Sequence, residues 1–158
     1  MKKLFLGLFL FLSACGFSPL YQNITAESTD VPVKVAPIPN QYGFSMRQII
    51  QDKMGSFDTP LYTLTVSSPS FSSWDQTIDS KNFATIMGIR GTVHYQLIEN
   101  GTKKVILDNG ISMNSSYSVV KDPYATVVAE RKVKKELADQ LAEQISLHVL
   151  GTLAGINK

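Results

Sequence analysis

The sequence predicts an α+β fold, a two-layer sandwich of order β-α-β-β-β-α in which one mainly antiparallel sheet is covered on one face by two helices. Two long segments of alternating polarity, centred on 89–97 and spanning about 103–119, are separated by a turn sequence, as in an antiparallel hairpin. Each has one polar face, which is typical of a sheet covered on one side only. Two segments with helical spacing of apolar residues supply the covering layer.

The first half of this pattern begins with a short strand and a helix. Residues 31–36 alternate as a strand would, and Pro32 limits them to an edge or a strand start. From about Ser45 the apolar residues follow helical spacing until Gly55, which is expected to end the helix. Residues 61–66, rich in β-branched and aromatic side chains, predict the next strand. Residues 67–82 are Ser- and Asp-rich and predict a loop or a ragged strand.

The long strand has two distinct faces. Apolar residues and Gly91 share one face, and Arg90, Thr92, His94 and Gln96 share the other. Asn100-Gly101 predicts a tight hairpin turn with positive φ at both residues, and Asn109-Gly110 predicts a bulge in the return strand. The last helix is expected to start after Asp122, with Asp122 as its cap and Pro123 in the first turn, and to end near Gly151. Its buried stripe is expected to be Val133, Leu137, Ala138, Leu141 and Ile145.

The N-terminus predicts a lipoprotein precursor. Lys2 and Lys3 precede an apolar run from Leu4 to Leu12, which is too short to span a bilayer and has the layout of a secretory signal. Leu12-Ser13-Ala14-Cys15 resembles the bacterial lipobox, in which the cysteine carries a diacylglyceryl group and an N-terminal acyl group. The alternative is an ordinary signal peptide with an incidental cysteine. By resemblance to bacterial lipoproteins, Gly16 after the cysteine favours the outer membrane.

Three regions follow from this interpretation: a removed signal peptide over 1–14, a lipidated N-terminus and polar tether over 15–30, and a single α/β domain over 31–158. Removing the first 14 of 158 residues leaves 144, enough for one domain with a core. It also removes two of the 15 basic residues, so 13 remain against 13 acidic residues. That balance argues against nucleic acid as a partner.

The sequence argues against an enzyme and against a metal site or other cofactor. Cys15 is the only cysteine, and His94 and His148 are far apart in sequence, without ligand spacing. No phosphate-binding glycine loop or hydrolase motif is present. The basic cluster of Arg131, Lys132, Lys134 and Lys135 is expected to be a solvated helix face that pairs with nearby acidic residues.

Two stretches resemble the lipopolysaccharide-assembly lipoprotein family LptE in its alphaproteobacterial form. The first is Cys15-Gly16-Phe17-Ser18-Pro19-Leu20-Tyr21. The second runs from Ser116-Tyr117-Ser118 through Asp122-Pro123-Tyr124-Ala125 and Ala129-Glu130-Arg131 to Leu137-Ala138-Asp139-Gln140. The resemblance covers nearly the whole chain after the signal peptide and implies the family's two-layer α/β fold.

The resemblance also implies a function. LptE proteins are not enzymes; they plug the β-barrel LptD, support lipopolysaccharide transport and assembly, and contact lipopolysaccharide. By match to the family's basic positions, Lys81 and Lys121 are the candidate lipopolysaccharide-binding residues here, with Arg90 as a weaker one. Partners are then LptD, lipopolysaccharide and the inner leaflet of the outer membrane. The alternative is a periplasmic adaptor or binding lipoprotein of another envelope transport system.

Overall fold

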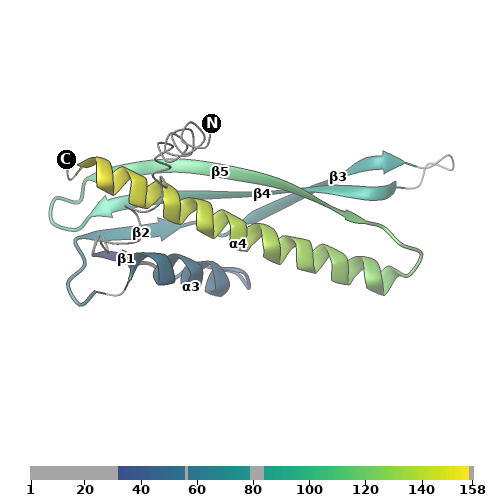
Figure 1. Cartoon of the computed structure of the whole chain (residues 1–158), viewed down its shortest axis with the longest axis horizontal. Helices are drawn as coiled ribbons and strands as arrows, with labels where there is room; N and C mark the ends of the chain where they lie inside the picture. Colours follow the sequence, from purple (N-terminus) through teal and green to yellow (C-terminus); the bar gives the residue numbers. More distant parts are fainter. Residues whose placement is uncertain (1–31, 56, 79–83, 157–158) are drawn as a thin grey trace, which may run out of the picture.

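A five-stranded sheet carries two helices on one of its faces in the computed structural model, which describes residues 32–55, 57–78 and 84–156 (Figure 1). The predicted α+β class is confirmed, and residues 70–78 form a further strand in the region expected to be a loop or a ragged strand. In order, the elements are β1 (Val33–Val35), α3 (Gly43–Met54), β2 (Tyr62–Val66), β3 (Ser70–Ile78), β4 (Ala84–Glu99), β5 (Val105–Ser118) and α4 (Pro123–Ile156).

Strand β4 organises the sheet because three other strands pair with it, all antiparallel. Strand β5 runs along one side of β4, while β2 and β3 share the other side, β2 beside residues 95–99 and β3 beside residues 84–92. Strand β1 pairs with β2 in parallel, so α3 forms the crossover between them. The sheet is therefore mixed but mainly antiparallel, as the sequence predicts.

Strands β2 and β3 follow one another along β4 and are separated by a bulge at residues 67–69. The Ser67 N–H donates to the His94 carbonyl at 2.8 Å, whereas Ser70 pairs with Thr92. From Ser67 to Ser70 the chain advances three residues, whereas β4 advances only two from His94 to Thr92. The connection between β2 and β3 therefore contains one extra residue. Pro69, which has no N–H to contribute to a ladder, occupies this bulge.

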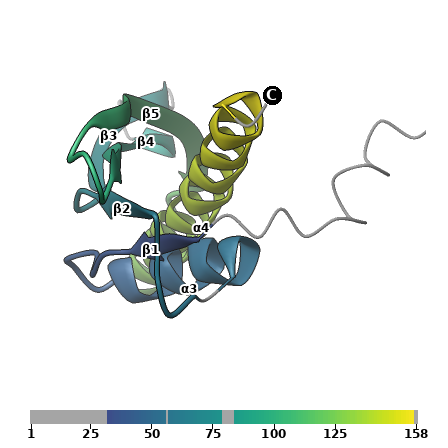
Figure 2. The same ribbon diagram turned by 90° about the vertical axis from the view of Figure 1, so that its left-hand side faces the viewer.

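The core lies between the inner face of the sheet and the two helices (Figure 2). Strand β4 contributes alternate residues, including Val93, Tyr95 and Leu97, all at most 2% exposed. The expected stripe of α4 is buried against them, and α3 adds Met46, Ile50 and Met54. Complete burial of each such side chain contributes about 1.5–3 kcal/mol, so this face accounts for the position of both helices.

The start of α4 agrees with the sequence prediction, but its end does not. Asp122 caps the start as predicted: its Oδ1 accepts the Tyr124 N–H at 2.9 Å, and Pro123 is the first helical residue. The predicted end at Gly151 is wrong, because the helix continues to Ile156. Leu153 is 1% exposed and extends the buried stripe by two further turns, so packing overrides the weak helix propensity of glycine. At the end of α3, Gly55 has φ 79° and stops the helix as expected.

The β4–β5 hairpin forms as predicted, but its turn is different. Neither Asn100 nor Gly101 has positive φ; the left-handed residue is Lys103, at φ 59°. The side chain of Asn100 instead ties the hairpin to β2, because its Nδ2 donates to the Pro60 carbonyl and its Oδ1 accepts from Thr63 Oγ1, both at 2.7 Å. These long-range contacts select a wider turn than the dipeptide alone indicates.

The predicted bulge at Asn109-Gly110 is also wrong. The β4–β5 register passes through this dipeptide without a shift, and the irregularity lies where Leu97 and Ile98 pair with Leu107 and Val105. Gly110 has a different use. A Cβ there would lie 3.3 Å from Cδ2 of His94 on the neighbouring strand, so glycine leaves space for the imidazole.

Candidate functional site

The outer surface of the sheet carries no helix and is lined by polar side chains. We call this surface the open face. Its members are Ser70 and Ser72 of β3, Arg90, Thr92, His94 and Gln96 of β4, and Asp108, Ser112, Asn114 and Ser116 of β5. The predicted division of the long strand into a polar face and an apolar face is confirmed, since Arg90, Thr92 and His94 are exposed while the intervening residues are buried.

Hydrogen bonds between β4 and β5 link the longer side chains of the open face across the two strands. Arg90 Nε donates to Asn114 Oδ1 at 2.9 Å, and Gln96 Nε2 donates to Asp108 Oδ2 at the same distance. The side chain of His94 is 60% exposed, and its Nε2 lies 3.5 Å from the other carboxylate oxygen of Asp108. With few charges and many hydroxyl and amide groups, this surface can form hydrogen bonds with a polar partner and has little net field to repel one.

The chain's only tryptophan also belongs to this surface. Trp74 pairs with Gly88 across β3 and β4, and a Cβ on Gly88 would come within 2.2 Å of the indole. The glycine therefore allows the ring to lie on the sheet, where it remains 40% exposed. An aromatic ring among hydroxyl and amide groups is a common anchor in protein interfaces.

The predicted binding residues are only partly described. Cys15 and Lys81 lie outside the described residues. Lys121 is exposed, just beyond Val119, whose N–H donates to the Thr85 carbonyl at 3.0 Å. Ile78 pairs with Ala84, so the described ends of β3 and β4 lie at this same end of the sheet. Arg90 lies five residues farther along β4, about 17 Å from Thr85, and does not share that end.

Exposed apolar side chains lie close to Lys121 in the chain, on the segment just before α4 and on its first turns. Tyr124, Val127 and Val128 are 76%, 43% and 45% exposed, and follow one another at helical spacing on the first turns of α4. Val120, also exposed, immediately precedes Lys121. This end of the molecule therefore combines a cation with apolar surface, the two features that an anionic lipid requires.

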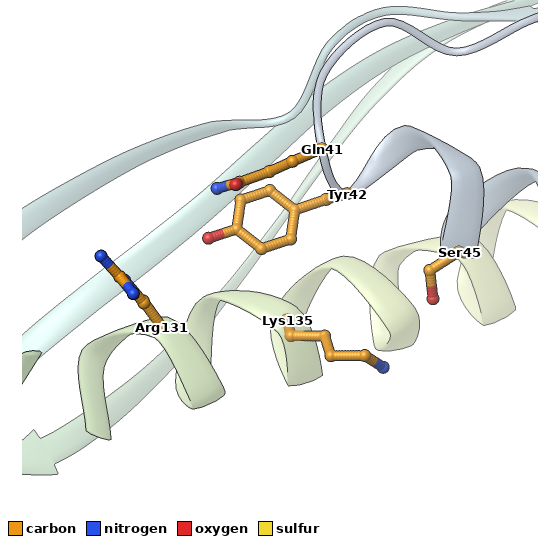
Figure 3. Close-up of a pocket in the computed structure, with 5 residues that line it drawn as sticks. All are labelled: Gln41, Tyr42, Ser45, Arg131 and Lys135. Atoms are coloured by element: carbon orange, nitrogen blue, oxygen red, sulfur yellow. The ribbon is translucent and has the colours of Figure 1, made fainter. Parts of the chain in front are cut away.

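A pocket of about 240 Å³ lies between the start of α3 and the middle of α4 (Figure 3). Gln41, Tyr42 and Ser45 line it from one side, and Arg131 and Lys135 project from α4 on the other. Ser45 Oγ and Lys135 Nζ each approach Asp139 at 2.6 Å, so one cation of the pocket is already paired. The sequence marked only Arg131 and Lys135, as members of the basic cluster, and no local pattern marked Gln41, Tyr42 or Ser45.

The lysines of the α4 basic cluster form the expected ion pairs. Lys134 lies 2.5 Å from Glu130, Lys135 2.6 Å from Asp139 and Lys132 3.8 Å from Glu136, each at a spacing of four residues. Pairs of this kind at or near the surface contribute at most about 1 kcal/mol each. The cluster thus forms the ion-paired helix face that the sequence predicts, and two of its members, Arg131 and Lys135, also line the pocket.

Tyr95 and His148 form a polar contact between the core and α4. The Tyr95 hydroxyl is hydrogen-bonded to His148 Nδ1, and the two rings meet edge to face with centroids 6.0 Å apart. Burial raises the pKa of Tyr95 above its ordinary value. The alternation of β4 assigns Tyr95 to the apolar face of the strand, but no local pattern indicates this partner, because 53 residues separate the two.

Among residues 32–55, 57–78 and 84–156, no group of three or more His, Cys, Asp or Glu side chains gathers as metal ligands would. None of the helices in the described part of the chain is long and apolar enough to cross a membrane.

Comparison of the structure with solved proteins identifies the fold. Rare lipoprotein B from Shewanella oneidensis superposes with a TM-score of 0.62 at 12% identity, over 80% of this chain and 98% of that one. A minor lipoprotein from Acinetobacter baumannii gives 0.54 at 17% identity, over 73% and 88%. Lipoprotein B from Nitrosomonas europaea gives 0.57 at 10% identity, over 72% and 78%. The chain therefore has the LptE-like fold of rare lipoprotein B. No family model and no curated protein matches the sequence.

Proposed function

We propose that this chain is an outer-membrane lipoprotein, anchored by lipid on Cys15, that plugs and supports the β-barrel LptD during lipopolysaccharide transport and assembly. The open face is the observation that carries the proposal. A plug must present a surface compatible with a water-filled lumen, and lumen walls are polar. Hydroxyl and amide groups of Ser72, Thr92, Ser112 and Asn114 meet that requirement, whereas the opposite face is committed to the core.

Two further observations support the proposal. First, the stretch from Cys15 through Tyr21 and the strand–helix junction resemble LptE proteins in sequence. Second, the structure shares its fold with rare lipoprotein B. The end of the molecule around Lys121 supports contact with lipopolysaccharide. Its cation suits a lipid phosphate, and Tyr124, Val127 and Val128 suit acyl chains.

Purification of the full-length lipidated protein from membranes in mild detergent tests the central proposal. A barrel protein of LptD type should be recovered in a one-to-one ratio. Recovery of an inner-membrane ATPase complex alone would contradict the proposal and support the adaptor alternative, and recovery of no partner would contradict it as well.

A pair of matched variants tests the open face itself. Thr92→Trp adds a bulky side chain at an exposed position in the middle of this face and should lower recovery of the barrel at least tenfold. Gln144→Trp makes the same addition on the exposed side of α4 and should not. Circular dichroism of both variants controls for folding. Equal recovery of the barrel with the two variants would remove the open face from the proposed interface.

Lipopolysaccharide binding is a separate test. Lys81→Glu with Lys121→Glu reverses the charge of both candidate residues and should weaken binding at least tenfold while barrel recovery persists. Arg90→Glu is a useful comparison, because Arg90 lies on the open face and bonds Asn114. Unchanged binding in the double variant would exclude these two lysines from the lipid site.

A further inference from the structure

The sheet has one edge that lacks the usual protection against strand pairing. Strand β1, at one edge, has only three residues, and Pro32 and Pro37 lie just before and after it. Strand β3, on the same side of β4, has register shifts after Asp75 and after Thr77. Short strands, prolines and bulges are the devices that blunt sheet edges. Strand β5, at the other edge, has 14 residues and pairs with β4 without a shift from Leu107 to Ser118.

The hydrogen-bond pattern identifies which main-chain groups of β5 point away from the sheet. Because Val119 donates to the Thr85 carbonyl, the odd-numbered residues of β5 bond β4 and the even-numbered residues direct their N–H and C=O groups outward. Donation from Ser67 to the His94 carbonyl agrees, since it assigns the even-numbered residues of β4 to the opposite neighbour.

Three consecutive outward positions are available for pairing. The Gly110 N–H is already bonded to the Asn109 side chain at 2.8 Å. By contrast, no described residue hydrogen-bonds the outward main-chain groups of Ser112, Asn114 and Ser116, and all three residues are exposed. They repeat every second residue, about 7 Å apart, which is the spacing that an added strand requires.

The composition of β5 also favours an added strand. Asp108 is its only charged residue, and it contains neither lysine nor proline. Ser112 and Ser116 are too small to obstruct a neighbouring backbone. On the inner face, Ile111, Met113 and Tyr117 are only half-buried under α4 and would contact the alternate side chains of such a strand. A matching strand would carry apolar residues at every second position and small polar residues between them.

We propose that the β5 edge from Ser112 to Ser118 receives an extended segment of the barrel partner, which adds a strand to this sheet. The identity of the partner rests on the proposed function. The β5 edge is continuous with the open face that we assign to the barrel, because the side chains of Ser112, Asn114 and Ser116 belong to that face. Main-chain pairing of this kind contributes affinity, and the alternate side chains contribute specificity.

Ser112→Pro compared with Ser112→Ala isolates the main-chain contribution. Proline removes an outward N–H that the fold does not use, and proline is tolerated at that position of an edge strand. With the full-length lipidated protein, Ser112→Pro should lower barrel recovery at least tenfold. Ser112→Ala keeps the N–H and removes only the hydroxyl, so it should recover several-fold more barrel than Ser112→Pro. Equal recovery with proline and alanine would overturn the inference.

Residue-resolved amide hydrogen exchange gives a second measurement that needs no variant. In the free protein, the amides of Ser112, Asn114 and Ser116 should exchange quickly and those of Ile111 and Met113 slowly. In the purified barrel complex, exchange of the three even-numbered amides should slow at least tenfold.

If these amides still exchange quickly in a stoichiometric complex, the added strand is wrong although the proposed function stands. Failure to recover any barrel contradicts the proposed function first. Protection in the free protein that grows with concentration assigns the edge to a second copy and overturns the partner proposed here.

Discussion

Tyr95 is the largest of the fully buried side chains, and its hydroxyl depends on a single partner, His148, on the exposed side of α4. Removing either residue breaks the same hydrogen bond, but the two losses are not equal. Without His148 the hydroxyl stays buried and unpaired, whereas without the hydroxyl the imidazole still reaches water. The asymmetry between these two losses sets the cost of each substitution.

We therefore expect His148→Ala to cost about 1–3 kcal/mol of unfolding free energy and Tyr95→Phe about 1 kcal/mol. Urea denaturation of the two single variants and the double variant measures both the costs and the coupling. In the Tyr95→Phe background, His148→Ala should cost clearly less than in the original protein. Additive costs would show that the hydrogen bond contributes nothing beyond packing.

Tyr95 also predicts how stability responds to alkaline pH. Burial raises its pKa in the folded state above the ordinary value of 10.0, so above that pH the unfolded chain loses the phenolic proton first. The folded state then holds more protons than the unfolded state, and unfolding free energy falls as pH rises. Stability measured from pH 9 to 11 should fall less steeply in Tyr95→Phe than in the original protein. Parallel curves would contradict this assignment.

At the scale of the element, Gly151 illustrates where local propensity loses to packing. It lies inside α4, and the buried residues Val149 and Leu153 keep the helix on the core on either side of it. A Cβ at Gly151 would meet no atom within 4 Å. The position has no steric need for glycine, so glycine only weakens the helix there.

Gly151→Ala should therefore stabilise the protein by about 0.5–1 kcal/mol, measured by thermal or urea unfolding. Gly155→Ala is the matched control. Its Cβ would also lie in open space, but it is next to the last residue of the helix, where the gain should be smaller. A loss of stability in Gly151→Ala would show that the helix does not continue through this residue in solution.

The same elements show how far sequence patterns determine this fold. Alternation in β4, helical spacing in α3 and α4, and the Asp122 cap are local signals, and each predicted its element correctly. The turn at Asn100 and the end of α4 depend on contacts with Pro60, Thr63 and the core, which no local pattern contains. The pocket between Tyr42 and Arg131 was missed for the same reason, since its two walls are almost 90 residues apart in sequence.

At the scale of the whole molecule, buried contacts are unevenly distributed along the sheet. The main core gathers β1, β2, α3 and the second half of β4 with the middle and end of α4. The first half of β4 is held by a small cluster of Ile89, Val133 and Leu137. Local opening should therefore be easier at the end of the sheet that carries Lys121.

Amide exchange within β4 tests this gradient with matched positions. Met87, Val93 and Tyr95 all lie on the side of β4 that bonds β5, so their amides have equivalent hydrogen bonds. We expect the amide of Met87 to exchange at least tenfold faster than those of Val93 and Tyr95. Uniform exchange along the strand would show instead that the sheet opens only as one cooperative unit.

The bulge at residues 67–69 has a consequence for sequence change over time. Before it, the even-numbered Leu64 and Val66 face the core; after it, the odd-numbered Phe71 does. Loss of one residue from this bulge, such as Ser68, would leave a single residue opposite Val93 and restore a uniform strand, with Ser70 still opposite Thr92 and Phe71 still facing the core. The bulge is therefore a place where the chain can lose one residue and keep the same side chains on each face of the sheet.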